Sequence, residues 1–323
     1  MKIDPTRVPV SDADGLHTRH LSVAGGLRQF GAYVDRLDPG AFSSRRHWHT
    51  AEDEMIYVLE GTVTLRDDRG MQDLHPGDAV AWPHGVVNGH HLTNRGSVPC
   101  HYVIVGSRVT EDICHYPDEG SRLINSATTW QIVDKSGQIL RHGELPADLL
   151  DLSDNWGKPY AGPNPPDILR DSPAAWETAS DYCHPILGGG LGDYRYRLLG
   201  DPGGLSQFGA HVEELPPGAR SSFRHWHEAE DEFIYLLSGH LVLIEDVETA
   251  LAPGDCAAWP AGAAIGHCLE NRGDLPARYL VIGTRRQTDT IHYPDHDLVT
   301  YKDGPHRRYT HADGRPRVKG ETP

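Results

Sequence analysis

The sequence predicts an all-β protein in which one barrel or sandwich domain is used twice. Three observations support this prediction. The chain repeats itself at a nearly constant offset, short runs rich in β-branched and aromatic residues alternate with glycine and proline turns, and no long segment outside the middle of the chain has helical periodicity. The length of 323 residues also allows roughly two domains of ~150 residues each.

The internal repeat is strongest over two blocks. Residues 40–61 read GAFSSRRHWHTAEDEMIYVLEG and are identical to residues 218–239 at 16 of 22 positions. Residues 77–96 match residues 254–273 at 12 of 20 positions, and the tetrapeptide HYPD follows once in each copy. A tandem duplication of one domain explains this pattern.

The stretch between the copies is rich in proline and ends in the run GGGLG. This composition is typical of a linker rather than of a packed domain. We therefore divide the chain into an N-terminal domain at residues 1–145, a Pro/Gly-rich linker at 146–192 and a C-terminal domain at 193–323.

Within the first copy, five runs are predicted as strands because they are rich in β-branched and aromatic residues. They cover residues 30–37, 54–59, 62–66, 79–82 and 100–105. Turn signals that combine proline and glycine separate several of these runs, at residues 38–40, 75–77 and 83–85. Corresponding runs recur in the second copy, so we expect the same barrel or sandwich twice.

Composition and charge exclude several classes of protein. The formal net charge of −16 opposes binding to a phosphate backbone, so we expect no nucleic-acid partner. No apolar run approaches the ~18–20 residues of a membrane span, and the first residues lack the apolar core of a secretory signal, so we expect a cytoplasmic protein without membrane contact. The five cysteines are odd in number and lack CxxC spacing, which predicts reduced, mostly structural thiols.

Two histidines separated by one residue are the clearest chemical signal. Alternate side chains of a strand share a face, so His47 and His49 point the same way. Three acidic residues follow, and the apolar strand that begins directly after them favours Glu54 over Glu52 and Asp53 as the partner of the histidines. The second copy repeats this arrangement with every candidate residue retained.

A further histidine comes from the second block. His90 aligns with His267 in the other copy, whereas its neighbour His91 aligns with Cys268, so His90 is the better candidate. The predicted metal ligands are His47, His49, Glu54 and His90 in the first copy and His225, His227, Glu232 and His267 in the second. Three imidazoles and one carboxylate suit a first-row divalent ion and leave coordination positions open. We therefore predict one divalent transition metal per domain: Fe, Mn, Ni, Cu or Zn.

These blocks resemble the two sequence motifs of the cupin superfamily, and the whole chain resembles a bicupin with tandem domains of the Cupin_2 type. The first motif corresponds to Gly40, His47, His49, Glu54 and Gly61, an RHWH variant of HxHxxxxE, and the second to Gly77, Pro83, Gly85, His90 and Asn94. Both copies share the same two small departures in motif spacing. The resemblance implies two tandem jelly-roll (double-stranded β-helix) barrels joined by the Pro-rich linker, with a metal inside each barrel.

Three functions follow from the metal sites and the resemblance. The first is an oxidoreductase of the Fe(II)-type dioxygenase class that acts on a small anionic or phenolic substrate, with Glu54 and Glu232 as catalytic bases. The second is a non-redox, metal-dependent decarboxylase, lyase or isomerase. The third is a metal-containing small-molecule binding protein without turnover. We expect a small-molecule substrate, and an exposed sheet edge leaves homo-oligomer formation open.

Differences between the copies indicate where a substrate binds. Arg45 precedes the paired histidines by an even number of residues and corresponds to Phe223 in the second copy, and Asn88 corresponds to an isoleucine. Tyr33 and His211 occupy equivalent positions on an earlier strand. We predict Arg45, Asn88, Tyr33 and His211 as substrate-binding residues, with a more polar pocket in the first copy.

Overall fold

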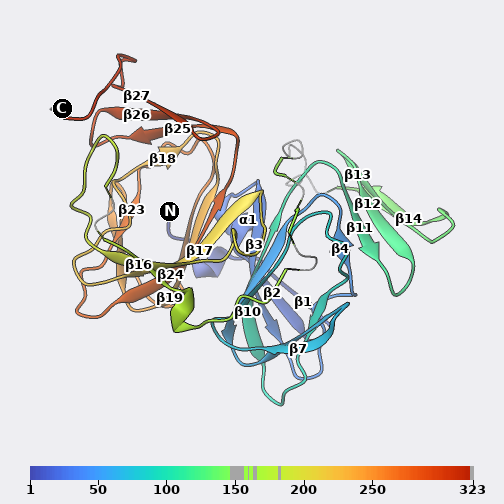
Figure 1. Ribbon diagram of the computed structural model, residues 1–323. Coiled ribbons are helices and arrows are strands. Elements are labelled where there is room, and N and C mark those ends of the chain that lie inside the picture. The colour runs from blue at the N-terminus through green and yellow to red at the C-terminus, as the bar shows by residue number, and fades with distance from the viewer. Residues whose placement is uncertain (146–155, 159, 163–165, 181–182, 321–323) are drawn as a thin grey trace.

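The computed structural model confirms the all-β fold and the two similar halves. It describes residues 1–145, 156–158, 160–162, 166–180 and 183–320. The other residues of the predicted linker, at 146–155, 159, 163–165 and 181–182, lie outside the described part of the chain. Figure 1 shows the two halves side by side, one coloured from blue to green and the other from yellow to red. Among the described residues, no helix is long and apolar enough to cross a membrane.

The N-terminal half is built around a six-stranded antiparallel sheet with the order β1-β2-β3-β10-β5-β8. Its strands are β1 (Val10–Ala13), β2 (Leu16–His20), β3 (Phe30–Leu37), β10 (Cys100–Ser107), β5 (Glu54–Glu60) and β8 (Ala79–Trp82). The predicted strands at 30–37 and 79–82 coincide with β3 and β8, and the other predicted strands deviate by at most two residues at either end. The short helix α1 (Leu21–Gly25) follows β2.

Two smaller sheets close the N-terminal half, with the orders β7-β6-β9 and β14-β13-β12-β11-β4. Their strands are β6 (Val63–Asp67), β7 (Gly70–Leu74), β9 (His91–Thr93), β4 (Trp48–His49), β11 (Asp112–Tyr116), β12 (Ser121–Asn125), β13 (Thr129–Val133) and β14 (Ile139–Glu144). The strands β12, β13 and β14 of the five-stranded sheet lie at the side of the molecule in Figure 1.

The C-terminal half repeats this arrangement almost strand for strand. Its large sheet has the order β15-β16-β17-β24-β19-β22, and its smaller sheets are β21-β20-β23 and β18-β25-β26-β27. The strands are β15 (Glu177–Ala179), β16 (Tyr194–Leu198), β17 (Phe208–Leu215), β18 (Trp226–His227), β19 (Glu232–Ser238), β20 (Leu241–Ile244), β21 (Glu248–Leu251), β22 (Cys256–Trp259), β23 (Cys268–Glu270), β24 (Ala277–Thr284), β25 (Thr288–Tyr293), β26 (Leu298–Asp303) and β27 (His306–Thr310).

Alternation along β5 divides the apolar residues between two cores. Ile56 and Val58 point into the N-terminal barrel, where they join a fully apolar cluster. Met55 and Tyr57 point the other way, into a cluster that also contains residues of the C-terminal half. This second cluster includes Phe30 and Phe208, whose ring centroids lie 6.3 Å apart. The two large sheets therefore pack face to face, and the inside of each barrel remains available for a site.

A short segment that precedes each large sheet pairs with the edge strand of the other half. Lys2 forms an antiparallel bridge with Ala257 on the edge strand β22, and Leu169 forms the equivalent bridge with Ala79 on β8. A short 3-10 helix follows each bridge, η1 (Pro5–Arg7) after the first and η3 (Pro173–Ala175) after the second. These exchanged segments cover sheet edges that would otherwise be exposed. The predicted linker thus contains Leu169 and strand β15, and the proposed domain boundaries remain a prediction.

Candidate metal centres

Three histidines and one glutamate converge inside the N-terminal barrel. His47 and His90 face each other across a backbone bridge, His49 lies on β4, and Glu54 begins β5. The Glu54 Oε2 atom lies 3.6 Å from Nε2 of His47, 3.8 Å from Nε2 of His49 and 3.1 Å from Nε2 of His90. We call these four residues the N-terminal quartet.

The C-terminal barrel contains the same arrangement, here called the C-terminal quartet: His225, His227, Glu232 and His267. The Nε2 atoms of His227 and His267 lie 3.8 Å and 2.9 Å from Glu232 Oε2, and Nε2 of His225 lies 4.0 Å from Oε1. In both halves the four predicted residues come from three separate segments of the chain. The fold brings together every residue that the sequence predicted as a ligand.

The other ring nitrogen of each histidine is held by an acceptor. Nδ1 of His47 donates to the Arg45 carbonyl at 2.9 Å, and Nδ1 of His90 donates to the Asn88 carbonyl at 3.0 Å. A carbonyl oxygen only accepts, so Nδ1 of each ring carries a proton. Nε2 of His90 is within hydrogen-bonding distance of Glu54 Oε2, and in a neutral ring this nitrogen would offer its lone pair to a bound cation. The carbonyls of Phe223 and Ile265 hold the C-terminal rings in the same way.

A buried aspartate holds the remaining histidine of each quartet. Asp112 Oδ2 lies 2.6 Å from Nδ1 of His49, and Asp289 Oδ2 lies 2.5 Å from Nδ1 of His227. Neither aspartate was among the residues predicted from the sequence. The signal was present, because the repeated HYPD is preceded in both copies by an aspartate at the same spacing.

A tryptophan stacks on the last histidine of each quartet. The Trp82 ring lies parallel to the His90 ring at 3.9 Å, and the Trp259 ring lies parallel to the His267 ring at 3.7 Å. Trp82 is also the cross-strand partner of Glu54 in the pairing of β5 with β8. These contacts fix the ring planes, so Nε2 of each stacked histidine keeps its direction.

Burial and charge set the protonation of the quartets. Burial lowers the pKa of His225 to about 4. Burial opposes the charged form of His227 as well, but the Glu232 and Asp289 carboxylates raise the pKa of this ring to about 9. The histidines in turn hold the pKa of Glu232 below its ordinary value, although burial opposes this. In the N-terminal half, the Glu54 and Asp112 carboxylates likewise raise the pKa of His49 above its ordinary value, although burial opposes this.

The two halves match one family model. The model described as "Cupin domain" matches residues 33–106 and residues 211–283, and these segments hold all eight quartet residues. The chain belongs to the cupin superfamily. Because the domain occurs twice, the protein is a bicupin with the double-stranded β-helix fold that the sequence predicted.

The bicupin is similar to several known proteins. A sugar phosphate isomerase of the cupin superfamily from Silicibacter pomeroyi is 42% identical over 46% of this chain and 95% of that chain, with a TM-score of 0.43. An oxalate decarboxylase from Lactobacillus farciminis is 17% identical over 88% of this chain and 86% of that chain, with a TM-score of 0.51, which shows the fold alone. The tetracenomycin polyketide synthase protein TcmJ from Streptomyces glaucescens is 37% identical over 76 residues. That match covers 24% of this chain and about half, 49%, of the length of that relative.

Three consecutive acidic residues of the bicupin have three different surroundings. Glu54 points into the N-terminal quartet, as described above. Asp53 is completely buried between the halves, where it accepts hydrogen bonds from the backbone N–H groups of His84, Ser206 and Gln207. Glu52 lies behind His49 and accepts a hydrogen bond from the Val109 N–H group. The prediction that Glu54 is the quartet carboxylate therefore agrees with the geometry.

A cavity of about 260 Å³ opens beside the N-terminal quartet of the bicupin. Its lining includes His49, Glu52, Glu54 and Tyr33. Burial raises the pKa of the Glu52 carboxyl to about 8, with a further contribution from nearby Asp112. A carboxyl group with a strongly shifted pKa in a cleft beside a candidate metal site is typical of a functional position.

The C-terminal quartet has its own cavity of about 210 Å³, and His211 lines it together with Glu232. Two of the predicted substrate-binding residues, Tyr33 and His211, therefore face the cavities. Neither Arg45 nor Asn88 is among the residues that line the two cavities. The Arg45 guanidinium is exposed and pairs with Glu119 at 2.9 Å. The Asn88 side chain is buried and bonds to Asp67 and to the Asp68 N–H group. The substrate-binding roles of Arg45 and Asn88 stay predictions.

The two halves differ beside Glu52. The equivalent residue in the C-terminal half, Glu230, forms an ion pair with Nζ of Lys302. The N-terminal half has Asn125 at the position of Lys302, because Asp112 pairs with Asn125 as Asp289 pairs with Lys302. In the described part of the chain, no lysine or arginine lies within ion-pair distance of Glu52. Glu52 thus faces an open cavity without the lysine partner that Glu230 has, and its charged neighbour is the His49 ring at 3.8 Å.

The quartets of the bicupin fit a divalent transition metal. Three Nε2 lone pairs and one carboxylate oxygen are a suitable donor set for such an ion. Glu232 Oε2 is buried and accepts no hydrogen bond from any described residue, so its lone pairs are available to a metal ion. His47, Glu54 and His90 also lie close enough together to hold one ion, as do His225, His227 and Glu232.

Proposed function

We propose that the bicupin is a metal-dependent enzyme that holds one divalent ion in each quartet and converts a small organic substrate at the N-terminal quartet. The ligands would be His47, His49, Glu54 and His90 in one half and His225, His227, Glu232 and His267 in the other. A bound ion would supply Lewis acidity toward a carboxylate, enolate or phenolate oxygen of the substrate. The observation that supports the N-terminal half is the open cavity in which Glu52 has no lysine or arginine partner among the described residues, whereas Glu230 pairs with Lys302.

Within this proposal, Glu52 is the group that accepts or returns a proton of the substrate. Glu54 and Glu232 were predicted as catalytic bases, but their oxygens face three imidazoles and suit the role of ligands better. Glu52 lines the same cavity as His49 and Tyr33, so a substrate in this cavity would lie against its carboxyl group. Tyr33 would orient the substrate through its hydroxyl group, which Arg108 contacts at 3.1 Å.

The position of Glu52 favours a non-redox reaction, such as a decarboxylation, elimination or isomerisation that needs a proton carrier. The names of the relatives give no specific support for a dioxygenase, which was the first function predicted from the sequence. The dioxygenase remains the second candidate, because the four residues of the quartet leave coordination positions of the metal open for further ligands.

A matched pair of variants tests the proposal. Purified protein is screened against hydroxy acids, keto acids, sugar phosphates and phenols, with product formation and oxygen consumption followed in parallel. Glu52→Gln should lower turnover at least about 100-fold while the metal content stays unchanged, and Glu230→Gln should not lower turnover. Equal losses in both variants would contradict the assignment to the N-terminal half. Oxygen consumption in step with product formation would select the dioxygenase instead.

A further inference from the structure

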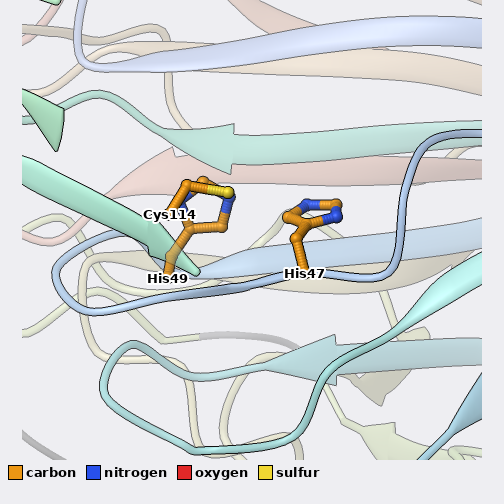
Figure 2. Close-up of side chains that lie close together, drawn as sticks. All are labelled: His47, His49 and Cys114. Atoms are coloured by element: carbon orange, nitrogen blue, oxygen red, sulfur yellow. The ribbon is translucent and has the colours of Figure 1, made fainter. Parts of the chain in front are cut away.

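A thiol lies against the N-terminal quartet. Cys114 is on β11 and is the cross-strand partner of His49 on β4, so both side chains lie on the same face of this sheet. Figure 2 shows the Cys114 sulfur beside the His49 ring and facing His47. The candidate ligand atoms of Cys114, His47 and His49 all lie within 4.8 Å of one another. The sulfur is therefore close to two of the three imidazoles of the N-terminal quartet.

The surroundings of Cys114 favour a functional thiol over a packing residue. Cys114 is a free cysteine and is buried. Its sulfur lies within 4.8 Å of a ring nitrogen of His49 and of a ring nitrogen of His47, so it faces polar groups. The other half has Ile291 at this position, because Ile291 pairs with His227 as Cys114 pairs with His49. An isoleucine satisfies the packing there, so the fold itself does not require sulfur.

We propose that Cys114 Sγ is an additional donor to the metal ion of the N-terminal quartet, so that the two quartets of one chain prefer different ions. This inference rests on the proposed function, because it requires an ion in the quartet. On binding, the thiol releases its proton to solvent and the sulfur binds as thiolate. A thiolate beside three imidazoles selects a more thiophilic ion, such as Co²⁺, Ni²⁺, Cu²⁺ or Zn²⁺. The C-terminal quartet has only nitrogen and oxygen donors and would also accept Mn²⁺.

Cobalt(II) is a probe that distinguishes sulfur donors from nitrogen and oxygen donors. Bound Co²⁺ gives weak visible bands with any donor set, whereas a cobalt–thiolate bond adds a strong charge-transfer band in the near ultraviolet. The full chain is used with the exposed Cys183 replaced by serine, so that a surface thiol does not contribute. In this background, His225→Ala with His227→Ala confines the cobalt to the N-terminal quartet.

Cys114→Ser and a reciprocal variant complete the experiment. We expect the background protein to show the charge-transfer band and Cys114→Ser to lose it completely while it keeps the visible bands. Ile291→Cys, added to Cys114→Ser with the C-terminal quartet intact, should restore the band. Thermal unfolding of each variant, followed by circular dichroism, shows that the chain is folded when the spectrum is recorded.

The outcomes separate this inference from the proposed function. Visible bands without a charge-transfer band in the background protein would overturn the role of Cys114 and leave the metal-dependent enzyme intact. A charge-transfer band that persists in Cys114→Ser would also overturn it. Failure of the folded chain to bind cobalt, manganese or zinc in either quartet would overturn the proposed function and this inference together.

Discussion

Asp112 Oδ2 lies 2.6 Å from Nδ1 of His49 and turns the opposite nitrogen of this ring toward Glu54. The same carboxylate accepts a hydrogen bond from the Ala51 N–H group, which fixes its own position. Partners of this kind orient a metal-binding histidine and raise its basicity. The contact thus links the β11 strand to the direction of a nitrogen lone pair in the quartet.

Replacing this carboxylate should weaken one metal site only. We expect Asp112→Asn to lower the affinity of the N-terminal quartet for Zn²⁺ by about 10–100-fold and to leave the C-terminal quartet unchanged. Asp289→Asn should have the reverse effect, because it holds His227 in the same way. Competition with a chromophoric chelator measures both affinities. Unchanged zinc affinity in both variants would show that these aspartates do not support the sites.

Exchanging the residues beside the two glutamates should move the ion pair between the halves. In Asn125→Lys, the new ammonium group can reach Glu52 as Lys302 reaches Glu230. We expect turnover to fall at least about 100-fold with two ions still bound, because the Glu52 carboxylate is then held in an ion pair with the ammonium group. Lys302→Asn is the matched variant and should retain turnover. Full activity of Asn125→Lys would contradict the role of an unpaired Glu52.

Asp53 should contribute to stability rather than to chemistry. It is completely buried and accepts hydrogen bonds from three backbone N–H groups, two of which belong to the other half. Asp53→Ala leaves these donors unsatisfied, so we expect a loss of about 2–5 kcal/mol in the free energy of unfolding. Chemical denaturation measures this loss. Asp246→Ala, at a side chain that is 90% exposed, is the control and should change stability by less than about 0.5 kcal/mol.

Removal of metal should lower the unfolding temperature without abolishing the fold. The apolar clusters inside the two barrels and between them contain none of the quartet residues. A bound ion at about 1,000 times its Kd adds ~4 kcal/mol, because it binds only the folded state. Chelation followed by dialysis should therefore give a β-rich protein that unfolds at a lower temperature, and added Zn²⁺ should restore the original value. A chelated protein with an unchanged unfolding temperature would contradict this expectation.

The repeat explains why so much of the site could be predicted. His47 and His49 share a face by local alternation, and comparison of the copies selected His90 over His91. Prediction failed where long-range pairing decides the contact. Asp112 lies 63 residues from His49, so only the pairing of β11 with β4 brings them together.

Arg45 illustrates the limit of local alternation. Its predicted direction assumed a strand that includes residue 45, but β4 begins at Trp48. The backbone before β4 follows a different path, and the Arg45 side chain pairs with Glu119 at the surface. The exchanged segments around Lys2 and Leu169 could not be predicted either, because no local sequence pattern indicates which sheet edge a segment covers.

We expect each half of one chain to hold a divalent ion in its quartet. Elemental analysis of the folded protein, purified aerobically and anaerobically and then loaded with Zn²⁺, measures this stoichiometry. The wild-type protein should contain two ions per chain. One ion should remain in His47→Ala with His49→Ala, and one in His225→Ala with His227→Ala. Less than about half an ion per wild-type chain, or two ions retained in either double variant, would contradict this stoichiometry.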